Sequence, residues 1–525
     1  MSNPPPQPNL SPLQRLRRWL ARPRGGDVIV ANVGSGASDV VVGKNILKIG
    51  TLVIPALPAA IALIAALFGA GAGLWLYLVP GKMPPGRFNV AVAEFGVVDA
   101  QGRARAAADG QLIDSTLFAT IQGELQNLAP DYPALVWHDS MSLLQKRAAI
   151  GLIAGPTPEE RSRAACQRAA DLNADIIVYG ALETGASPAR LRLQFCVRNT
   201  TRDRDMGNLD ELQQVDRLGS PLPVDLPLVD VPSSVNPPLR VRTTLLAKLV
   251  VGLRYELASN PNFASSARRA LDTFEGALRY LEQSEGAATA DNGGDLVYYF
   301  IGREQFLLAQ DPGTPAAEKP QRLDAARAAF GRAVELNPRY ARAWSALGGA
   351  YYQRTQLLGR SRRLSTGDLA AALRAYQSAI VAAQAARDRA AEAEARLALA
   401  LAYWLQADAF QYLARPDTPA TEAALDQADR EVAAGAALVD PAQNRLLGFA
   451  AMVRGTIGYE RAQVRLRAKD KPSARDLFQR ARDDYARCVA AGRADPGDQF
   501  LQRQIIAKTC APAEQQIGQV LQGLK

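Results

Sequence analysis

The sequence predicts a multi-domain protein with a single transmembrane helix, a small α/β domain and an all-α array of helical repeats, in that order. Three observations lead to this fold class. Residues 51–79 contain no charged side chain, residues 88–200 alternate between strand and helix patterns, and strand patterns disappear after residue 240. The length of 525 residues agrees with several domains, because one hydrophobic core does not support so long a chain.

The predicted membrane span is the longest apolar run of the chain. No charged residue lies between Lys48 and Lys82, and a bilayer needs only about 20 apolar residues in a helix. Trp75 and Tyr77 near the far end suit the aromatic belt of a membrane interface. We therefore expect a transmembrane helix at residues 51–79, which would place the lipid bilayer among the partners.

The orientation of this span follows from the basic residues around it. Seven precede it, and they are Arg15, Arg17, Arg18, Arg22, Arg24, Lys44 and Lys48. Only Lys82 and Arg87 follow it closely. Lys and Arg resist translocation, so we expect a single-pass protein of the cell membrane with a cytoplasmic amino terminus and extracytoplasmic carboxyl-terminal domains. The inverted orientation stays open as an alternative.

The cytoplasmic part contains two predicted segments. Residues 1–26 have the composition of a disordered, basic amphipathic segment, which includes "LQRLRRWLARPR". Residues 27–50 predict a short β-rich module, because "DVIV" recurs as "DVVV" between glycine-rich turns. The glycines do not match a phosphate-binding loop, since Lys44 is followed by Asn45 instead of Ser or Thr. The stretch "GDVIVANVGSGASDVVVGKNI" resembles short β-modules beside signalling or effector domains in some bacterial proteins.

Residues 86–215 are predicted to form the α/β domain. Strands are expected at "FNVAVAEFGVVD", "ALVWHD", "ADIIVYGAL" and "RLRLQFCVRN", and helices at "DGQLIDSTLFATIQGELQNL", "SMSLLQKRAAI" and "TPEERSRAACQRAADL". The last two strands are close enough for a hairpin, so we expect a mixed sheet. The prolines of residues 216–239 predict an extended linker after this domain.

Two stretches of this domain carry a family resemblance. The strand "VAVAEF", the helix after it, and "CQRAADLNADIIVYGALE" with its following strand are similar to the amino-terminal α/β domain of TolB-like and FlgO-like bacterial envelope proteins. The similarity spans residues 88–200. It implies a role in assembly or recognition.

Residues 240–525 are predicted to be an array of α-helical repeats, because one spacing recurs. A small residue, an aromatic residue and a second small residue follow each other at steps of four and three in Ala326, Phe330 and Ala333. The same steps recur in Ala270, Phe274, Ala277, in Ala372, Tyr376, Ala379 and in Ala474, Phe478, Ala481. Small residues let two helices approach while the aromatic side chain fills the space between them.

These spacings resemble the second helix of tetratricopeptide repeats, and "ARAWSALGGAYYQ" resembles the first helix. Trp344, Leu347, Gly348 and Tyr351 match the aromatic, Leu, small, aromatic series of that helix. Insertions such as "LLGRSRRLSTGD" depart from the 34-residue period. The resemblance implies a concave groove for peptides or other proteins, and its groove-facing positions would be Arg342, Ser345, Gly349, Tyr352 and Gln353. The family's clamp of paired Lys and Asn residues is not visible, so a terminal carboxylate ligand is not expected.

The sequence offers little for catalysis. The single histidine, His138, excludes sites built on two histidines, and the four cysteines contain no C-x-x-C pair. Their spacing leaves open whether Cys166 pairs with Cys196, or Cys488 with Cys510. We predict no catalytic residue, no metal site and no cofactor, so the protein is not expected to be an enzyme.

Composition and charge pattern argue against two further classes of protein, mainly disordered chains and specific nucleic-acid-binding proteins. Hydrophobic residues make up 48% and charged residues 22%, as in ordinary globular proteins, so the chain is not mainly disordered. The net charge is +9, but most basic residues are interspersed with acidic ones along helical stretches. This pattern indicates a solvated surface and no specific nucleic-acid partner.

The sequence as a whole predicts a membrane-anchored scaffold for protein-protein interaction in a bacterial envelope. Its repeats would bind other proteins or peptides, and its α/β domain would act in recognition. Two alternatives stay open. In one, the protein is a transmembrane sensor or receptor whose α/β domain binds a small ligand. In the other, the inverted orientation makes it a signalling adaptor that faces the cytoplasm.

Overall fold

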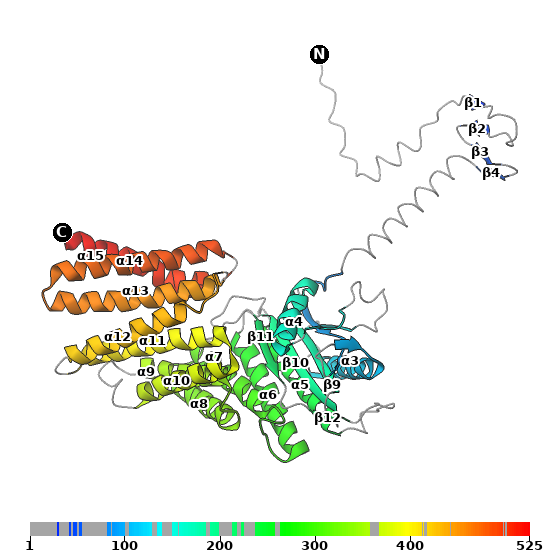
Figure 1. Ribbon diagram of the computed structural model, residues 1–525, viewed down its shortest axis with the longest axis horizontal. Coiled ribbons are helices and arrows are strands. Elements are labelled where there is room, and N and C mark those ends of the chain that lie inside the picture. Colours follow the sequence, from blue (N-terminus) through cyan, green and yellow to red (C-terminus); the bar gives the residue numbers. More distant parts are fainter. Residues whose placement is uncertain are drawn as a thin grey trace, which may run out of the picture. The chain divides into compact units, whose positions relative to one another are not determined.

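The computed structural model describes four strands within residues 29–54 and most of residues 81–524 (Figure 1). Beyond residue 81, the positions outside the description are 86, 100–103, 129–133, 139–149, 156, 185–188, 199–212, 218–221, 225–236, 258–262, 358–366, 412, 414–416, 442, 497, 499–500 and 525. The chain divides into two compact units, Met1–Gly81 and Lys82–Lys525.

The first unit contains a small antiparallel sheet with the strand order β1-β2-β3-β4. Its strands are β1 (Ile29–Val30), β2 (Val41–Gly43), β3 (Ile46–Ile49) and β4 (Leu52–Ile54). Runs of valine and isoleucine favour strands because β-branched side chains pack well on a pleated surface. The β-structure predicted for residues 27–50 is therefore present, and it extends beyond that range through β4.

The membrane span predicted for residues 51–79 needs a correction at its start. Leu52–Ile54 pair with Ile49, Lys48 and Leu47 of β3, so the predicted helix does not begin at residue 51. Residues 55–80 and the predicted segment 1–26 lie outside the described residues. Within the part of the chain that the structure describes, no helix is long and apolar enough to cross a membrane.

The second unit begins with a mixed sheet, as the sequence predicts. Its strands are β5 (Phe88–Val92), β6 (Gly96–Val98), β7 (Ala104–Ala106), β8 (Ala134–His138), β9 (Ile176–Glu183), β10 (Ala189–Arg198), β11 (Gln213–Arg217) and β12 (Leu222–Val224). The main order is β11-β10-β9-β5-β8, with β12 paired to β10 and with β6 paired to β7 and β9. Strand β5 runs parallel to β8 and β9, whereas β9 and β10 form the predicted antiparallel hairpin.

The two faces of this sheet build two different cores, because successive side chains of a strand point to opposite faces. Helix α4 (Pro158–Leu172) packs on one face with Ala91, Ile177 and Cys196. Helix α3 (Ala108–Leu128) packs on the other face with Val90 and Val178. The sheet therefore lies between two helical layers.

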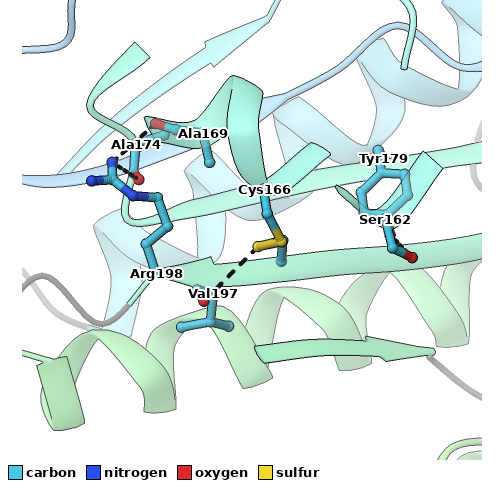
Figure 2. The surroundings of a disulfide bond; sticks show 8 residues. Ser162, Cys166, Ala169, Ala174, Tyr179, Val197 and Arg198 are labelled. Carbon is cyan, nitrogen blue, oxygen red and sulfur yellow. Dashed lines mark hydrogen bonds between the residues drawn. A yellow bond between two sulfur atoms is a disulfide. The ribbon is translucent and has the colours of Figure 1, made fainter. Parts of the chain in front are cut away.

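A disulfide bond ties α4 to the sheet. The cysteines are Cys166 on α4 and Cys196 on β10, with their Cα atoms 5.6 Å apart (Figure 2). Next to it, Arg198 Nη1 donates hydrogen bonds of 3.0 Å to the carbonyl oxygens of Ala169 and Ala174, which belong to the end of α4 and the turn after it. The pairing that the sequence leaves open is thus settled for these two cysteines.

Three predictions for the α/β region differ from the structure or fall outside it. The stretch "FNVAVAEFGVVD" forms two strands, β5 and β6, instead of one. Part of the predicted linker 216–239 belongs to the sheet, because β11 and β12 pair with β10. Pro223 is tolerated in β12 since this short strand lies at the edge of the sheet. The helix predicted at "SMSLLQKRAAI" lies outside the described residues, apart from Ile150.

The rest of the chain is helical. Its helices are α5 (Pro237–Leu257), α6 (Phe263–Glu285), α7 (Gly294–Gln310), α8 (Lys319–Leu336), α9 (Ala341–Leu357), α10 (Asp368–Ala386), α11 (Arg389–Gln411), α12 (Thr418–Ala436), α13 (Asn444–Arg467), α14 (Lys471–Ala494), η2 (Leu501–Cys510) and α15 (Ala511–Gly523). They pack as successive pairs, from α5 with α6 to η2 with α15 (Figure 1). The first helices of the pairs begin at residues 237, 294, 341, 389, 444 and 501, so every repeat is longer than 34 residues.

In the pairs α5–α6, α7–α8 and α9–α10, the recurring spacing of small and aromatic residues forms the contact between the two helices. Phe330 and both of its small partners are fully buried on α8, and a glycine of the preceding helix, Gly302, faces the ring. A Cβ atom on Gly302 would lie 2.7 Å from Phe330 Cδ1, closer than real contacts allow. Gly252 faces Phe274 and Gly348 faces Tyr376 in the same way. Glycine on one helix thus makes room for the aromatic side chain of the next.

Helix α5 belongs to the helical array and to the α/β region at once. It packs against α6 and also against α3. Lys248 of α5 lies 3.5 Å from the carboxylate of Glu124 on α3. Most of α5 from Leu239 to Tyr255 is buried, including the charged side chains of Arg242 and Arg254. The core of α3 continues through α5 into the first repeats.

Candidate functional site

The first helices of the repeats surround a cavity of 520 Å³. Helices α7, α9, α11, α13 and η2 supply most of its lining, and α8, α10 and α14 add single aromatic rings. Its lining therefore runs from Phe306 near the end of α7 to Thr509 near the end of η2. The volume falls in the range of about 300–1,000 Å³ that small-molecule and cofactor sites occupy.

Four of the five groove positions predicted from the sequence line this cavity. They are Ser345, Gly349, Tyr352 and Gln353, which lie along one face of α9 at steps of three and four residues. Arg342, the fifth, lies near the start of α9, is half-buried and does not line the cavity. Gln356, four residues after Tyr352, also lines it and donates a 3.0 Å hydrogen bond to the Tyr352 hydroxyl.

Two sides of the cavity differ in chemistry. The side formed by α9 is polar or small, and Gln310 of α7 adds another amide to it. Helices α11 and α13 contribute mainly apolar, half-buried side chains, and these are Leu401, Trp404, Leu446, Phe449 and Met452, together with Glu394, Arg445 and Thr456. An occupant would therefore meet hydrogen-bonding groups on one side and apolar groups on the other.

The charges at the cavity are few. Among the described residues that line it, only Glu394 and Arg445 are charged. Arg445 is buried and donates two hydrogen bonds to Asp498, of 2.6 Å to Oδ2 and 2.8 Å to Oδ1. This bidentate ion pair largely neutralises the guanidinium group.

Helix η2, the last inner helix, is held in place at both ends. Asp498 Oδ1 accepts a 2.9 Å hydrogen bond from the backbone N–H of Leu501 at the start of η2. At the other end, Cys510 forms a disulfide bond with Cys488 of α14, with 6.3 Å between the Cα atoms. The helix has π-type backbone hydrogen bonds, which are rare and occur frequently at functional sites. Its Ile505 and Thr509 reach the cavity.

A hydrogen bond between two helices supports the apolar side of the cavity. Thr456 of α13 and Tyr485 of α14 both line the cavity, and their hydroxyl oxygens are 3.0 Å apart. Burial raises the pKa of the Tyr485 phenol to about 12. The phenol is therefore protonated at neutral pH and available to this hydrogen bond.

A buried carboxylate lies one helical turn beyond Thr456. Glu460 of α13 accepts a 2.6 Å hydrogen bond from Gln411 Nε2 of α11. Burial raises the pKa of Glu460, and the carboxylate of Asp408 raises it further. The hydrogen bond from Gln411 opposes these effects by stabilising the charged form.

Only part of the cavity lining can be predicted from sequence patterns. Helix α9 carries the aromatic, Leu, Gly, aromatic series, and the resemblance based on that series predicts the groove positions beside it. Trp404, Phe449 and Met452 carry no such series. One signal does point to Trp404. When "ALGGAYY" of α9 is aligned with "LALALAYW" of α11 at their aromatic ends, Trp404 occupies the position that corresponds to Tyr352.

The described residues do not form a metal centre, since they contain no group of three or more His, Cys, Asp or Glu side chains that could hold an ion. His138 lies at the end of β8, where its ring centroid is 3.9 Å from that of Phe118.

The fold and the cavity define a protein with an α/β sheet region joined to an array of helix pairs. No family model matches the chain, and no curated protein matches it either.

Proposed function

We propose that the protein is a membrane-anchored scaffold for protein-protein interaction, with a tetratricopeptide-like groove and an α/β recognition domain outside the cytoplasm. The main support is the inner surface of the helical array. Helix pairs stack so that their first helices share one surface, and the predicted groove positions Ser345, Gly349, Tyr352 and Gln353 lie on it. Stacked repeats of this kind form extended binding surfaces in other proteins.

The disulfide bonds support the extracytoplasmic part of this proposal. Cys166 pairs with Cys196 and Cys488 pairs with Cys510. Disulfide bonds form and persist in oxidising compartments and are rare in the cytosol. All four cysteines lie after the predicted span, so an extracytoplasmic location of these domains is compatible with both bonds.

Site-specific photo-cross-linking in living cells tests the scaffold function. A photoreactive amino acid would replace exposed Gln356 on the inner helix α9, and in a matched variant it would replace Val381, which is 67% exposed on α10. We expect a defined cross-linked partner from position 356 and none from position 381. Equal cross-linking from both positions, or none from position 356 in cells that produce the protein at its natural level, would contradict the proposal.

Protease shaving of spheroplasts tests the location independently. The chain would carry a different tag at each end. We expect the carboxyl-terminal tag to be lost while the amino-terminal tag survives. Protection of the carboxyl-terminal tag together with loss of the amino-terminal tag would place the repeats in the cytoplasm.

A further inference from the structure

The cavity is partly open and is lined by helices that lie far apart in the sequence. Its lining includes Phe306 and Gln310 of α7 and also Ile505 and Thr509 of η2, so the array curves around it. Its volume of 520 Å³ lies within the range of about 300–1,000 Å³ that small-molecule sites occupy, so an organic molecule of that size would fill it.

The two sides of the cavity select for a particular chemistry. Leu401, Trp404 and Phe449 offer an apolar surface on which an aromatic or aliphatic body can pack. Gln310 of α7 and Gln353 of α9 also line the cavity, and each carries an amide that can both donate and accept hydrogen bonds. An apolar molecule with a few hydrogen-bonding groups satisfies both sides, whereas a wholly apolar one leaves the amides without partners.

The charges disfavour an anion. Arg445 is the cation of the described lining, and its guanidinium already makes the two hydrogen bonds to Asp498. Glu394 is the other charged residue of the described lining, and as a carboxylate it offers an anion no ion pair. An anionic ligand would therefore lose its hydration in the cavity without gaining a strong ion pair.

The end wall of the cavity is formed before any ligand arrives. The Cys488–Cys510 disulfide bond and the Arg445–Asp498 ion pair hold η2 at its two ends. A pre-formed wall reduces the ordering cost of binding, which favours a small ligand that cannot offset this cost with a large interface.

We propose that this cavity is a binding site for a small, uncharged organic molecule with an aromatic or aliphatic body and at least two hydrogen-bonding groups. The site shares its α9 residues with the proposed protein-binding groove, but binding of a small molecule there does not depend on the scaffold function. It also places ligand binding in the helical array, whereas the sensor alternative predicted from the sequence places it in the α/β domain.

Isothermal titration calorimetry on the full chain in lipid nanodiscs tests this site, with empty nanodiscs as the blank. The probe is N-acetyl-tryptophanamide, which is uncharged and carries an indole ring and two amides. N-acetyl-tryptophan serves as the matched anion, because it differs only in a carboxylate in place of one amide. We expect saturable binding of one N-acetyl-tryptophanamide per chain, and binding of the anion that is weaker by about tenfold or more.

Three variants locate the binding. Gln353→Trp places a larger side chain in the cavity from a half-buried position on α9, and it should weaken binding of the probe about tenfold. Phe449→Ala removes an apolar surface of the cavity and should weaken binding of the probe several-fold. Val381→Trp adds the same side chain on exposed α10 and should leave binding unchanged. Circular dichroism and the thermal midpoint show whether each variant is folded.

The outcomes separate the two proposals. Absence of saturable binding, equal binding of the anion, or binding that Gln353→Trp leaves intact would overturn the small-ligand site. The affinity of N-acetyl-tryptophanamide is also compared with that of a blocked nine-residue peptide that has a central tryptophan. If the peptide binds about a hundredfold tighter than the single blocked residue, the occupant is a polypeptide and the small-ligand site is wrong. The cross-linking result at Gln356 decides the scaffold function in every case.

Discussion

The glycine-aromatic contacts between paired helices make a sharp prediction about stability. In an open helix position, replacement of glycine by alanine stabilises a protein by about 0.5–1 kcal/mol, because alanine has the higher helix propensity. Gly302 is not open. A new Cβ atom there would lie 2.7 Å from Phe330 Cδ1 and 2.8 Å from its Cε1. Phe330 is fully buried and packs near Tyr299, with 6.0 Å between the ring centroids, so the ring has little room to move.

The expected magnitude follows from two opposing effects. Overpacking of a buried contact costs about 1–3 kcal/mol, and the gain in helix propensity offsets up to about 1 kcal/mol of it. Gly302→Ala should therefore be neutral to destabilising by about 2 kcal/mol. Gly331→Ala is the matched control, since Gly331 is the neighbour of Phe330 on α8 and its Cβ would meet no atom within 4 Å. The control should be stabilised by about 0.5–1 kcal/mol.

The assay compares urea unfolding midpoints of the two variants and the unchanged protein by circular dichroism. The difference between the two variants isolates the contact with the ring, because both gain the same helix propensity. We expect Gly331→Ala to be more stable than Gly302→Ala by about 1–3 kcal/mol. A further change of Phe330→Leu should reduce this difference, since the smaller side chain leaves space for the Cβ atom. Equal stability of the two alanine variants would refute the reasoning.

Three further predictions concern the disulfide bond of the α/β region, the ion pair and the buried carboxylate. Cys166→Ser with Cys196→Ser should lower the free energy of unfolding by about 3.6 kcal/mol, worked from the 30-residue separation of the cysteines, and unchanged denaturant stability would contradict it. Arg445→Met should cost about 3–5 kcal/mol because it leaves Asp498 buried without its ion-pair partner, and a thermal midpoint equal to that of the unchanged protein would argue against this. Because the folded pKa of Glu460 is raised, its protonation stabilises the fold below its ordinary pKa and this stabilisation is lost as pH rises through the folded pKa. Glu460→Gln should therefore gain stability relative to the unchanged protein from pH 4 to pH 8 in urea titrations, and a gain that does not change with pH would contradict the linkage.

The sequence was sufficient for the elements whose periodicity is strong. Strand β9 carries a continuous apolar run, and β10 alternates polar and apolar residues in "RLRLQF". The repeats show their small-aromatic-small spacing, so both regions could be predicted. Strand β11 could not, because "QQVDR" has no apolar alternation and its pairing with β10 depends on the fold. In α12, Val432 lies between Ala428 and Gly435 at the same steps of four and three, but without an aromatic residue this spacing does not identify a repeat.

The cavity was predictable only on one side. The α9 positions follow from a local pattern, and local patterns are visible in a sequence. The rest of the lining depends on how far the array curves, because that curvature brings Phe306 of α7 and Thr509 of η2 to the same space. Small rotations between successive repeats set the curvature, and no single residue type encodes them. The pairing of Cys488 with Cys510 has the same origin, since it requires η2 to fold back on α14.

Helix α5 belongs to both the sheet region and the helical array, so a mechanical force applied to one region is transmitted to the other. A pull on the sheet at residue 88 would pass through α3 and α5 into the repeats, because these helices share one continuous core. The sheet and the array would then yield together in a stretching experiment, as a single rupture event. A gene fusion that moved the repeats to another protein would have to bring the sheet with them, or supply a new cover for the apolar surface of α5.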